Sequence, residues 1–296
     1  MKEWTVKSDV RLDKFLHEKV PSLSYGILRK YLKENKIKVD GKKQPLSFRL
    51  SAGNIVRLYA DPSGSISFVP VYEDEALLIA NKPAGLPVCG QEDADTLLAR
   101  AQTYLRTQGQ DSLSLRLCHR LDTGTSGLVL LAKTPQAEAF FTQLIRDRAL
   151  CKKYLCVTFG RPVPESDTLQ DYLIKNSEKG TVRIVSAPLP GAKEITTRYR
   201  TLAVSGRLAL LEVTLITGRT HQIRAHLASI GCPILGDSKY GNQAANRELK
   251  FKYQALCAYS LVFPEITQEP FAALSKQHFE LDFPWYAQQV LKQTIK

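Results

Sequence analysis

The stretch HRLDTGTSGLVLLA, residues 119–132, places the densest polar cluster of the chain directly before an uninterrupted apolar run. The run at 128–132 predicts a buried strand, because short apolar segments bounded by turn residues are typical of strands covered on both faces. Before it stands Asp122, among an arginine, hydroxyl side chains and glycines. This loop is either an active-site loop that keeps the carboxylate ionised, or a turn in which Asp122 bonds its own backbone. Local chemistry alone leaves both interpretations open.

Strand and helix patterns alternate around this stretch from residue 69 onward. We expect a strand pair over residues 72–80 and single strands over 154–158 and 208–216. Thr134 followed by Pro135 predicts the capped start of a helix. The apolar stripe of that helix would consist of Ala137, Phe140, Phe141, Leu144 and Ile145.

A second short helix is expected to begin at Thr220, as its N-cap, and to end at Gly231. Arg224 lies about 100° from Ile223 around such a helix, at the border of its apolar face. An arginine near a helix N-terminus opposes the helix dipole, so we expect a carboxylate or phosphate to hold it; a surface arginine without a role is the alternative. The apolar face itself would carry Ile223, Leu227 and Ile230.

The first 60 residues carry most of the excess positive charge. They hold 14 lysines and arginines against 6 acidic residues, while the whole chain has a net charge of +12. A basic segment of this density predicts a polyanionic partner, because each neutralised phosphate releases condensed counterions. A solubilising surface is the alternative.

The same 60 residues predict a small α/β module followed by a linker at 61–68. Strands are expected over 37–39 and 55–59, with a hairpin-type turn at Asp40-Gly41. Two helices would bury apolar faces, the second being capped by Ser24; these faces carry Leu12, Phe15, Leu16 and Val20, then Ile27, Leu28, Tyr31 and Leu32. The other face of the second helix would present a basic stripe of Arg29, Lys33 and Lys36.

Several common functional sites are missing from the sequence. It has no phosphate-binding Walker loop, dinucleotide fingerprint or nucleophile elbow, so no nucleotide cofactor is expected. His221 and His226 would diverge by roughly 140° on a helix, which argues against a metal site there. His119 and Asp122 lie three residues apart, and a metal site would require ligands from distant parts of the chain. Without an export signal, a C-x-x-C pair or a membrane-length apolar run, we expect a soluble cytoplasmic protein whose six cysteines are reduced and mostly buried.

Residues 119–127 resemble the H-R-L-D-x-x-T-S-G signature of the RluA-type pseudouridine synthases. Three further segments resemble motifs of this family in the family's order, so that the resemblance spans about residues 69–265. These segments are Glu73-Asp74 with Asn81-Lys82-Pro83-Ala84-Gly85, then Lys152-Lys153-Tyr154, then TGRTHQIRAH at 217–226 with Gly236-Asp237 and Tyr240-Gly241. One departure is Cys89, where many members have a histidine.

The resemblance implies an α+β fold, in which a mixed, mainly antiparallel sheet with flanking helices follows the N-terminal module. It implies an enzyme that isomerises uridine in folded RNA without a cofactor: the glycosidic bond breaks, the uracil turns, and its carbon five rejoins the sugar. Asp122 would be the catalytic carboxylate, either adding to the base or assisting its departure from the sugar. Arg224 would be its cationic partner. Tyr154 would stack on the flipped uracil, near the proton that leaves, or would simply pack in the core.

The remaining site residues fall into three groups, of which Arg29, Lys33 and Lys36 come from the basic stripe of the N-terminal module and the others from the resemblance. The predicted RNA contacts are Arg120, Arg219, Arg29, Lys33 and Lys36. The residues that support the catalytic loop are His119, Thr125 and Ser126. Asp237 and Tyr240, like Thr125 and Ser126, are expected to be mainly architectural.

Residues 10–59 resemble the S-four-like RNA-binding domain in RLDKFL at 11–16, IKVDGK at 37–42 and AGNIV at 52–56. The expected organisation is therefore an RNA-binding domain over 1–60, a linker over 61–68 and a catalytic domain over 69–296. The resemblance favours large-subunit ribosomal RNA as substrate, with transfer RNA as the alternative, and nothing requires more than a monomer. Two rivals are a non-catalytic ribosome-associated RNA binder, disfavoured by the intact Asp122, Tyr154 and Arg224 set, and a nucleoside hydrolase, which needs a second acid.

Overall fold

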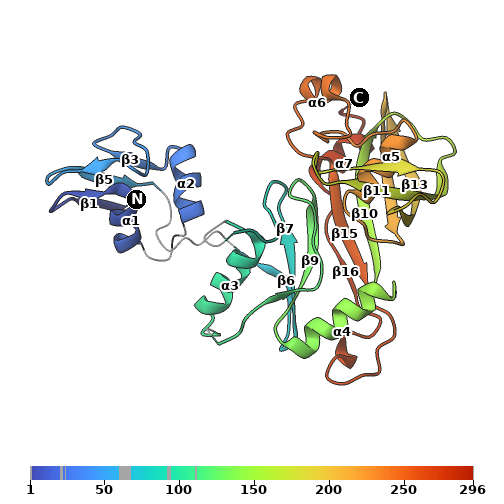
Figure 1. Ribbon diagram of the computed structural model, residues 1–296, viewed down its shortest axis with the longest axis horizontal. Helices are drawn as coiled ribbons and strands as arrows, with labels where there is room; N and C mark the ends of the chain where they lie inside the picture. Colours follow the sequence, from blue (N-terminus) through green and yellow to red (C-terminus); the bar gives the residue numbers. More distant parts are fainter. Residues whose placement is uncertain are drawn as a thin grey trace. The chain divides into compact units, whose positions relative to one another are not determined.

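The structure, a computed structural model, describes residues 2–20, 23, 25–59, 68–91, 95–110 and 112–295. The chain divides into one unit of Met1–Val69 with Cys89–Asp111, and a second of Pro70–Val88 with Ser112–Lys296 (Figure 1). The predicted cap Ser24 and all of the predicted linker except Phe68 lie outside the described residues. Within the part of the chain that is described, no helix has the length and apolar character that crossing a membrane requires.

The first unit contains the two expected helices, α1 (Leu12–Lys19) and α2 (Tyr25–Lys33), whose apolar faces are buried as predicted. A three-stranded antiparallel sheet has β5 (Ile55–Leu58) between β1 (Lys2–Thr5) and β3 (Ile37–Val39). The expected turn at Asp40-Gly41 is confirmed by φ values of 47° and 76°, the left-handed pair that tight hairpin turns use. The other elements of this unit are the strand pair β2 (Val10–Arg11) and β4 (Arg49–Leu50), and the helix α3 (Leu97–Thr107).

One part of the predicted basic stripe is wrong. Arg29 and Lys33 are exposed on α2, but Lys36 lies beyond the last residue of that helix. The helix cannot continue to Lys36 because Asn35 adopts a left-handed φ of 57°. Lys36 instead forms an ion pair with Glu34 at 2.7 Å.

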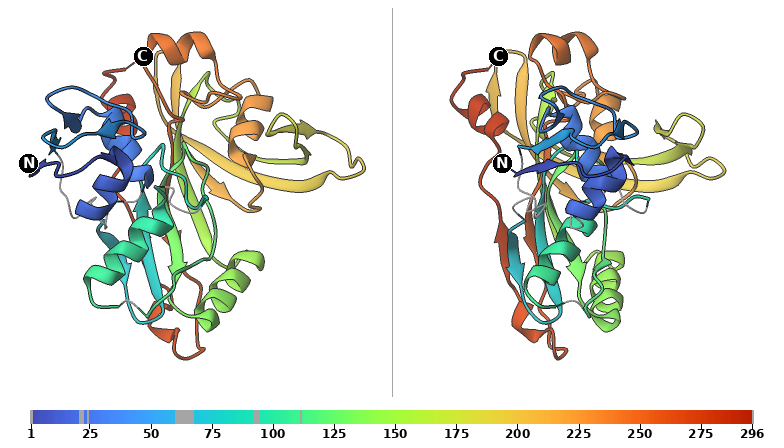
Figure 2. Two further views of the ribbon diagram at one scale, coloured as in Figure 1. Left: turned by 60° about the vertical axis from the view of Figure 1, so that its left-hand side comes forward. Right: turned by 90° about the vertical axis from the view of Figure 1, so that its left-hand side faces the viewer.

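The second unit is built on a mixed sheet, and its predicted class is confirmed. Along the sheet the order is β12-β11-β13-β14-β10-β15-β9-β7-β6, and β16 and β8 pair with β15 and β9. The strands are β6 (Pro70–Glu73), β7 (Leu77–Lys82), β8 (Arg116–Leu117), β9 (Ser126–Ala132), β10 (Cys151–Phe159), β11 (Ser166–Asn176), β12 (Thr181–Val185), β13 (Lys193–Ser205), β14 (Leu208–Leu215), β15 (Leu256–Val262) and β16 (His278–Glu280). In Figure 2, the connection between β12 and β13 projects from the rest of this unit.

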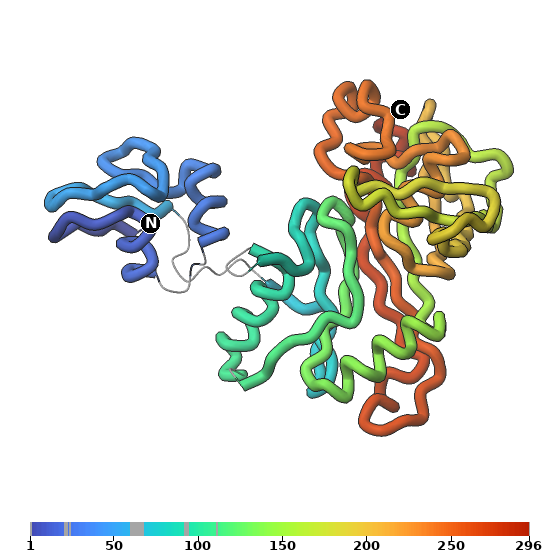
Figure 3. The backbone as a smooth tube through the Cα atoms, in the orientation of Figure 1, coloured from blue at the N-terminus to red at the C-terminus, as the bar shows by residue number. Residues whose placement is uncertain are grey.

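Among these pairs of described strands, β9 with β15 alone is parallel. Its register joins Ser126 to Cys257 and Gly127 to Ala258. A Cβ on Gly127 would lie 2.2 Å from the carbonyl oxygen of Ala258, so this close approach of two backbones requires glycine. Figure 3 shows β15, from near the C-terminus, running between β9 and β10. The loop at residues 119–127 thus leads directly into the junction of the sheet.

Helices cover both faces of this sheet. α4 (Pro135–Arg146) begins at the predicted cap, where Thr134 Oγ1 accepts from the Ala137 N–H at 3.1 Å, and packs with β7 and β9. Tyr154 and Cys156 of β10 face α5 (Gln222–Ser229), whereas Leu155 and Val157 face α7 (Trp285–Leu291). The other helical elements are α6 (Gln243–Glu248) and the 3₁₀ turn η1 (Ala272–Leu274). All six cysteines are free thiols, and four of them are buried, as expected.

Candidate active site

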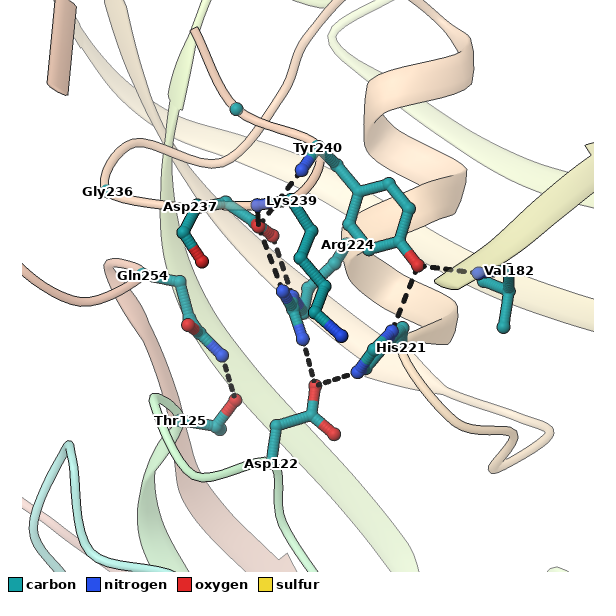
Figure 4. A network of polar contacts seen from close by, with 12 residues as sticks. Asp122, Thr125, Val182, His221, Arg224, Gly236, Asp237, Lys239, Tyr240 and Gln254 are labelled. Carbon is teal, nitrogen blue, oxygen red and sulfur yellow. Dashed lines mark hydrogen bonds and ion pairs between the residues drawn. The ribbon is translucent and has the colours of Figure 1, made fainter. Parts of the chain in front are cut away.

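One guanidinium joins the two halves of the candidate site. Arg224 on α5 donates from Nη1 to Asp122 Oδ2 at 2.7 Å (Figure 4). It also donates from Nε and Nη2 to the two carboxylate oxygens of Asp237, at 2.6 and 2.9 Å. The expectation that a carboxylate holds Arg224 is therefore confirmed, with two carboxylates instead of one.

Burial makes this cluster strongly interdependent. The Arg224 and Asp237 side chains are 5% and 0% exposed, whereas that of Asp122 is 26% exposed. Burial alone would lower the pKa of Arg224, but its bonds to Asp237 and Asp122 raise that pKa overall. Burial likewise opposes ionisation of Asp237, but Arg224 and the backbone N–H groups of Lys239 and Tyr240 bring its pKa below the ordinary value. Asp237 is thus a fixed anion that keeps Arg224 charged and in place.

The two oxygens of Asp122 have different surroundings. Oδ2 accepts from Arg224 and lies 3.9 Å from Nε2 of His221. Among the described residues none donates to Oδ1, which points away from Arg224 and His221 in Figure 4. The carboxylate is therefore anchored through one oxygen and free at the other, the arrangement that a nucleophilic or basic carboxylate requires.

A buried lysine holds the backbone beside Asp122. Lys82, at the end of β7, donates to the carbonyl oxygens of Pro83, Leu86 and Thr123 at 3.0, 2.7 and 3.1 Å. The ammonium is fully buried, and burial lowers the pKa of Lys82 to about 8, although the Asp122 charge opposes that shift. The three bonds fix the loop that carries Asp122.

The predicted supporting residues do support this loop. Thr125 is buried and its hydroxyl accepts from Gln254 Nε2 at 3.1 Å, while Ser126 donates to the Leu256 carbonyl at 3.4 Å. His119 Nε2 accepts from the Leu130 N–H at 3.2 Å. Burial lowers the pKa of His119 to about 3, so this imidazole stays neutral and ties the loop to β9.

Tyr154 lies in the core beside the site. Its side chain packs between β10 and α5 and is 5% exposed. Burial and then the Asp122 charge raise its pKa, so the phenol remains protonated. No hydrogen bond joins its hydroxyl to another described residue. Both interpretations of Tyr154, core packing and a place at the site, are compatible with this position.

The start of α5 differs from the prediction. Thr220 is not the N-cap; that position belongs to His221, which has a left-handed φ of 55° and makes no capping bond through its side chain. Instead, Oε1 of Gln222 accepts from the Arg219 N–H and the Thr217 hydroxyl, so a later side chain satisfies this turn. Ile230 was also placed wrongly, because the helix ends at Ser229 and Ile230 is 36% exposed. Gly231 follows with φ 73°, confirming the predicted end.

His221 and His226 point to different partners, as their spacing predicts. His221 faces Asp122 and Tyr240, whereas His226 contacts Thr197 and Asp171. Within the described residues, no three His, Cys, Asp or Glu side chains gather as metal ligands do.

The predicted RNA-contacting residues lie on the surface. Arg120 and Arg219 are exposed, and neither guanidinium pairs with another described residue. In the first unit, Arg29 lies over the ring of Tyr25 at 4.9 Å, and Lys33 is exposed.

Sequence reasoning missed the functions of three residues at the site. The motifs include Lys82 and His221 without indicating a role for either, and they do not include Gln254. A signal existed for Lys82, because an ammonium in an otherwise apolar strand must find several acceptors. For Gln254 the sequence offers no such signal, since its partner Thr125 is 129 residues away.

Comparison with known proteins identifies RNA pseudouridine synthases as relatives of this chain. Residues 76–229 match the family model described as RNA pseudouridylate synthase. A Rickettsia prowazekii protein named ribosomal large subunit pseudouridine synthase C is 32% identical, over 79% of this chain and 82% of that one. A Mycoplasma pneumoniae protein, named an uncharacterized RNA pseudouridine synthase, is 32% identical over 94% of both chains.

Solved structures resemble the chain in the same way. Human RNA pseudouridylate synthase domain containing 4 superposes with a TM-score of 0.61 at 27% identity, covering 76% of this chain and 92% of that one. Human RNA pseudouridylate synthase domain containing 1 superposes with a TM-score of 0.57 at 24% identity, which shows the shared fold.

Proposed function

The chain belongs to the RNA pseudouridylate synthase family, and we propose that its substrate is a uridine of large-subunit ribosomal RNA. The activity itself, isomerisation of uridine in RNA to pseudouridine, follows from family membership. Two observations support the choice of RNA. Relatives named for large-subunit ribosomal RNA are about one-third identical over most of both chains, and the net charge of +12 suits a large polyanion.

Asp122 is proposed as the catalytic carboxylate. The observation that carries this role is the asymmetry of its two oxygens: Arg224 holds Oδ2 at 2.7 Å, and Oδ1 is left open. Oδ1 is the atom that would attack, whether the target is the base or the sugar. Arg224 would orient the carboxylate, since Asp237 holds the guanidinium in place.

Tyr154 is proposed to stack on the flipped uracil. Its protonated hydroxyl has no partner among the described residues, and its ring lies within reach of the Asp122 charge. The target base must leave its stack at a cost of a few kcal/mol, so loops and bulges are favoured substrates. Arg120 and Arg219 are proposed to grip the RNA around the vacated position.

The first unit is proposed to be an accessory RNA-binding module of the S-four-like type. Its support is the basic excess of residues 1–60 and the exposed Arg29 and Lys33 on α2. A cytoplasmic location and a monomeric state remain predictions.

Tritium release tests the proposal directly. Ribosomal and transfer RNA from cells lacking the protein are labelled at carbon five of uridine and incubated with the wild-type chain and with Asp122→Asn. We expect release from large-subunit ribosomal RNA by the wild type alone, without free uracil.

The other outcomes separate the rivals. Release from transfer RNA alone would overturn the proposed substrate and leave the activity standing. Free uracil would mean hydrolysis, and tight binding without release would mean a non-catalytic binder. Retained turnover by Asp122→Asn would remove Asp122 from its proposed role.

A further inference from the structure

His221 occupies an unusual place at the rim of the site. It is the residue that precedes α5, and its φ of 55° and ψ of 15° lie in the left-handed region that side chains other than glycine seldom adopt. The turn before it is fixed by Gln222, whose amide nitrogen donates to Thr197 Oγ1 at 3.0 Å and to the Thr196 carbonyl at 3.1 Å. This backbone directs the imidazole toward Asp122 (Figure 4).

The hydrogen bonds of Tyr240 determine which ring nitrogen of His221 carries the proton. The Tyr240 oxygen accepts from the Val182 N–H at 2.7 Å, and the same oxygen lies 2.9 Å from His221 Nδ1. The phenol proton needs an acceptor, and among the described residues Nδ1 is the acceptor that the contacts of Tyr240 offer, so the proton is assigned to the bond from Tyr240 to Nδ1. The proton of a neutral His221 then sits on Nε2, the nitrogen that faces Asp122.

The groups around His221 keep it neutral. Burial lowers its pKa below the ordinary value, and the positive charges of Arg224 and Lys239 act in the same direction. The carboxylates of Asp122 and Asp237 oppose this shift without reversing it. At neutral pH the imidazole is therefore a dipole with its N–H toward a carboxylate, and not a second cation beside Arg224.

We propose that His221 is a positioning residue, whose Nε2–H steers Oδ2 of Asp122 and so presents Oδ1 to the substrate. This inference rests on the proposed role of Asp122. The present separation of Nε2 and Oδ2, 3.9 Å, is beyond a hydrogen bond, and contacts of this kind commonly tighten when substrate binds. A neutral donor orients the carboxylate while weakening it as a nucleophile less than another full charge would. Tyr240, from the loop after Asp237, sets the tautomer that makes the donation possible.

Two variants of similar shape test the contributions of the two ring nitrogens of His221 separately. His221→Asn retains an acceptor near the position of Nδ1 for Tyr240 and tolerates the left-handed backbone, but it has no group that reaches Asp122. His221→Gln retains an N–H near the position of Nε2. We expect His221→Asn to lower kcat by about 10²-fold with KM within about twofold, because misplacing a reacting group by 1 Å has effects of this size. His221→Gln should recover most of that loss.

A matched control and a spectroscopic measurement complete the test. His278→Asn alters an exposed histidine on β16, away from the site, and should leave kcat and KM unchanged. Nitrogen NMR of the wild-type protein should find His221 neutral and protonated on Nε2, and Tyr240→Phe should remove the preference for that tautomer. This readout needs no catalysis.

Several results would overturn the inference. It is wrong if His221→Asn turns over like the wild type, if Asn and Gln are equally impaired, or if only KM changes. It is also wrong if the wild-type proton sits on Nδ1. An inactive Asp122→Asn beside a fully active His221→Asn would refute this inference alone, whereas an active Asp122→Asn would refute the proposed function on which it rests.

Discussion

The loops that carry Asp122 and Asp237 bring two carboxylates to the same guanidinium, yet they treat them in opposite ways. Asp237 is fully buried, and both of its oxygens accept from Arg224 while Oδ1 also accepts from the N–H groups of Lys239 and Tyr240. Asp122 is 26% exposed and is held through one oxygen. Asp237 is held through both of its oxygens and Asp122 through only one, so the number of hydrogen-bonded oxygens distinguishes the two carboxylates better than their proximity to Arg224 does.

The largest expected effect is on the open carboxylate. Asp122→Asn preserves shape but removes the charge and nucleophilicity of Oδ1, so turnover should fall about 10⁴-fold or more. Because Asp122 is partly exposed, we expect the free energy of unfolding to change by less than about 1 kcal/mol. Tritium release and urea denaturation measure the two quantities. A large loss of stability would show that Asp122, like Asp237, is mainly structural.

For Asp237→Asn we expect the main effect on stability, whereas for Asp122→Asn it is on turnover. It leaves Arg224 without its buried partner, so the free energy of unfolding should fall by roughly 3–5 kcal/mol at neutral pH. Because the folded-state pKa of Asp237 is below its ordinary 3.8, its stabilisation is present above that value and is lost as pH falls through the lowered pKa. The difference in the free energy of unfolding between the wild type and Asp237→Asn should therefore become smaller in strong acid. Urea denaturation at several pH values measures this difference, and a difference that does not change with pH would contradict the prediction.

Lys82 sharpens the comparison, because it supports the Asp122 loop with a charge that burial disfavours. Between pH 8 and 10.5 the folded chain releases the Lys82 proton before the unfolded chain does, since its pKa is lowered to about 8. The unfolding free energy of the wild type should thus rise relative to Lys82→Met across this window, by on the order of 3 kcal/mol. Denaturation at several pH values measures the difference, and a constant difference would refute the shift.

The smallest effect is expected at the exposed arginine beside the open carboxylate. Arg120→Ala should weaken RNA binding roughly 3–10-fold and lower the slope of log affinity against log salt by about 1, because one phosphate contact is lost. The kcat at saturating RNA should stay unchanged. Arg146→Ala, on α4, is a control that also removes one exposed arginine. Equal losses of RNA affinity in both variants would show that Arg120 contributes only through its positive charge and makes no specific phosphate contact.

Elements with a strong local pattern could be predicted from the sequence. The helix after Thr134 and the strand at the end of the HRLD stretch were found because caps and apolar runs act within a few residues. The short strands β1, β2, β4, β8 and β16 were missed, since two to four residues carry no periodicity. Longer elements were missed as well, namely β11, β12, β13, β15, α3, α6 and α7. The start of α5 was wrong because a side chain inside the helix, Gln222, satisfies the turn that a cap was expected to satisfy.

The residues of the candidate site could be predicted where a single motif, or the charge of a single side chain, was enough to indicate them. The pairing of Arg224 with a carboxylate followed from its place near a helix N-terminus, and the motifs pointed to Asp122. The different hydrogen bonding of Asp122 and Asp237 could not be predicted from the sequence, because it depends on which backbone N–H groups lie near each carboxylate. The tautomer of His221 depends on Val182, which lies on a different strand from every motif.

The order of the strands has a consequence for how the enzyme is made. β15 lies between β10 and β9, although both are synthesised more than 90 residues earlier, and Arg224 follows Asp122 by 102 residues. A nascent chain therefore has a sheet in two unjoined parts, with Asp122 on one part and Arg224 on the other. The insertion of β15 closes this gap, so isomerase activity should first appear only after the chain has been translated past Val262.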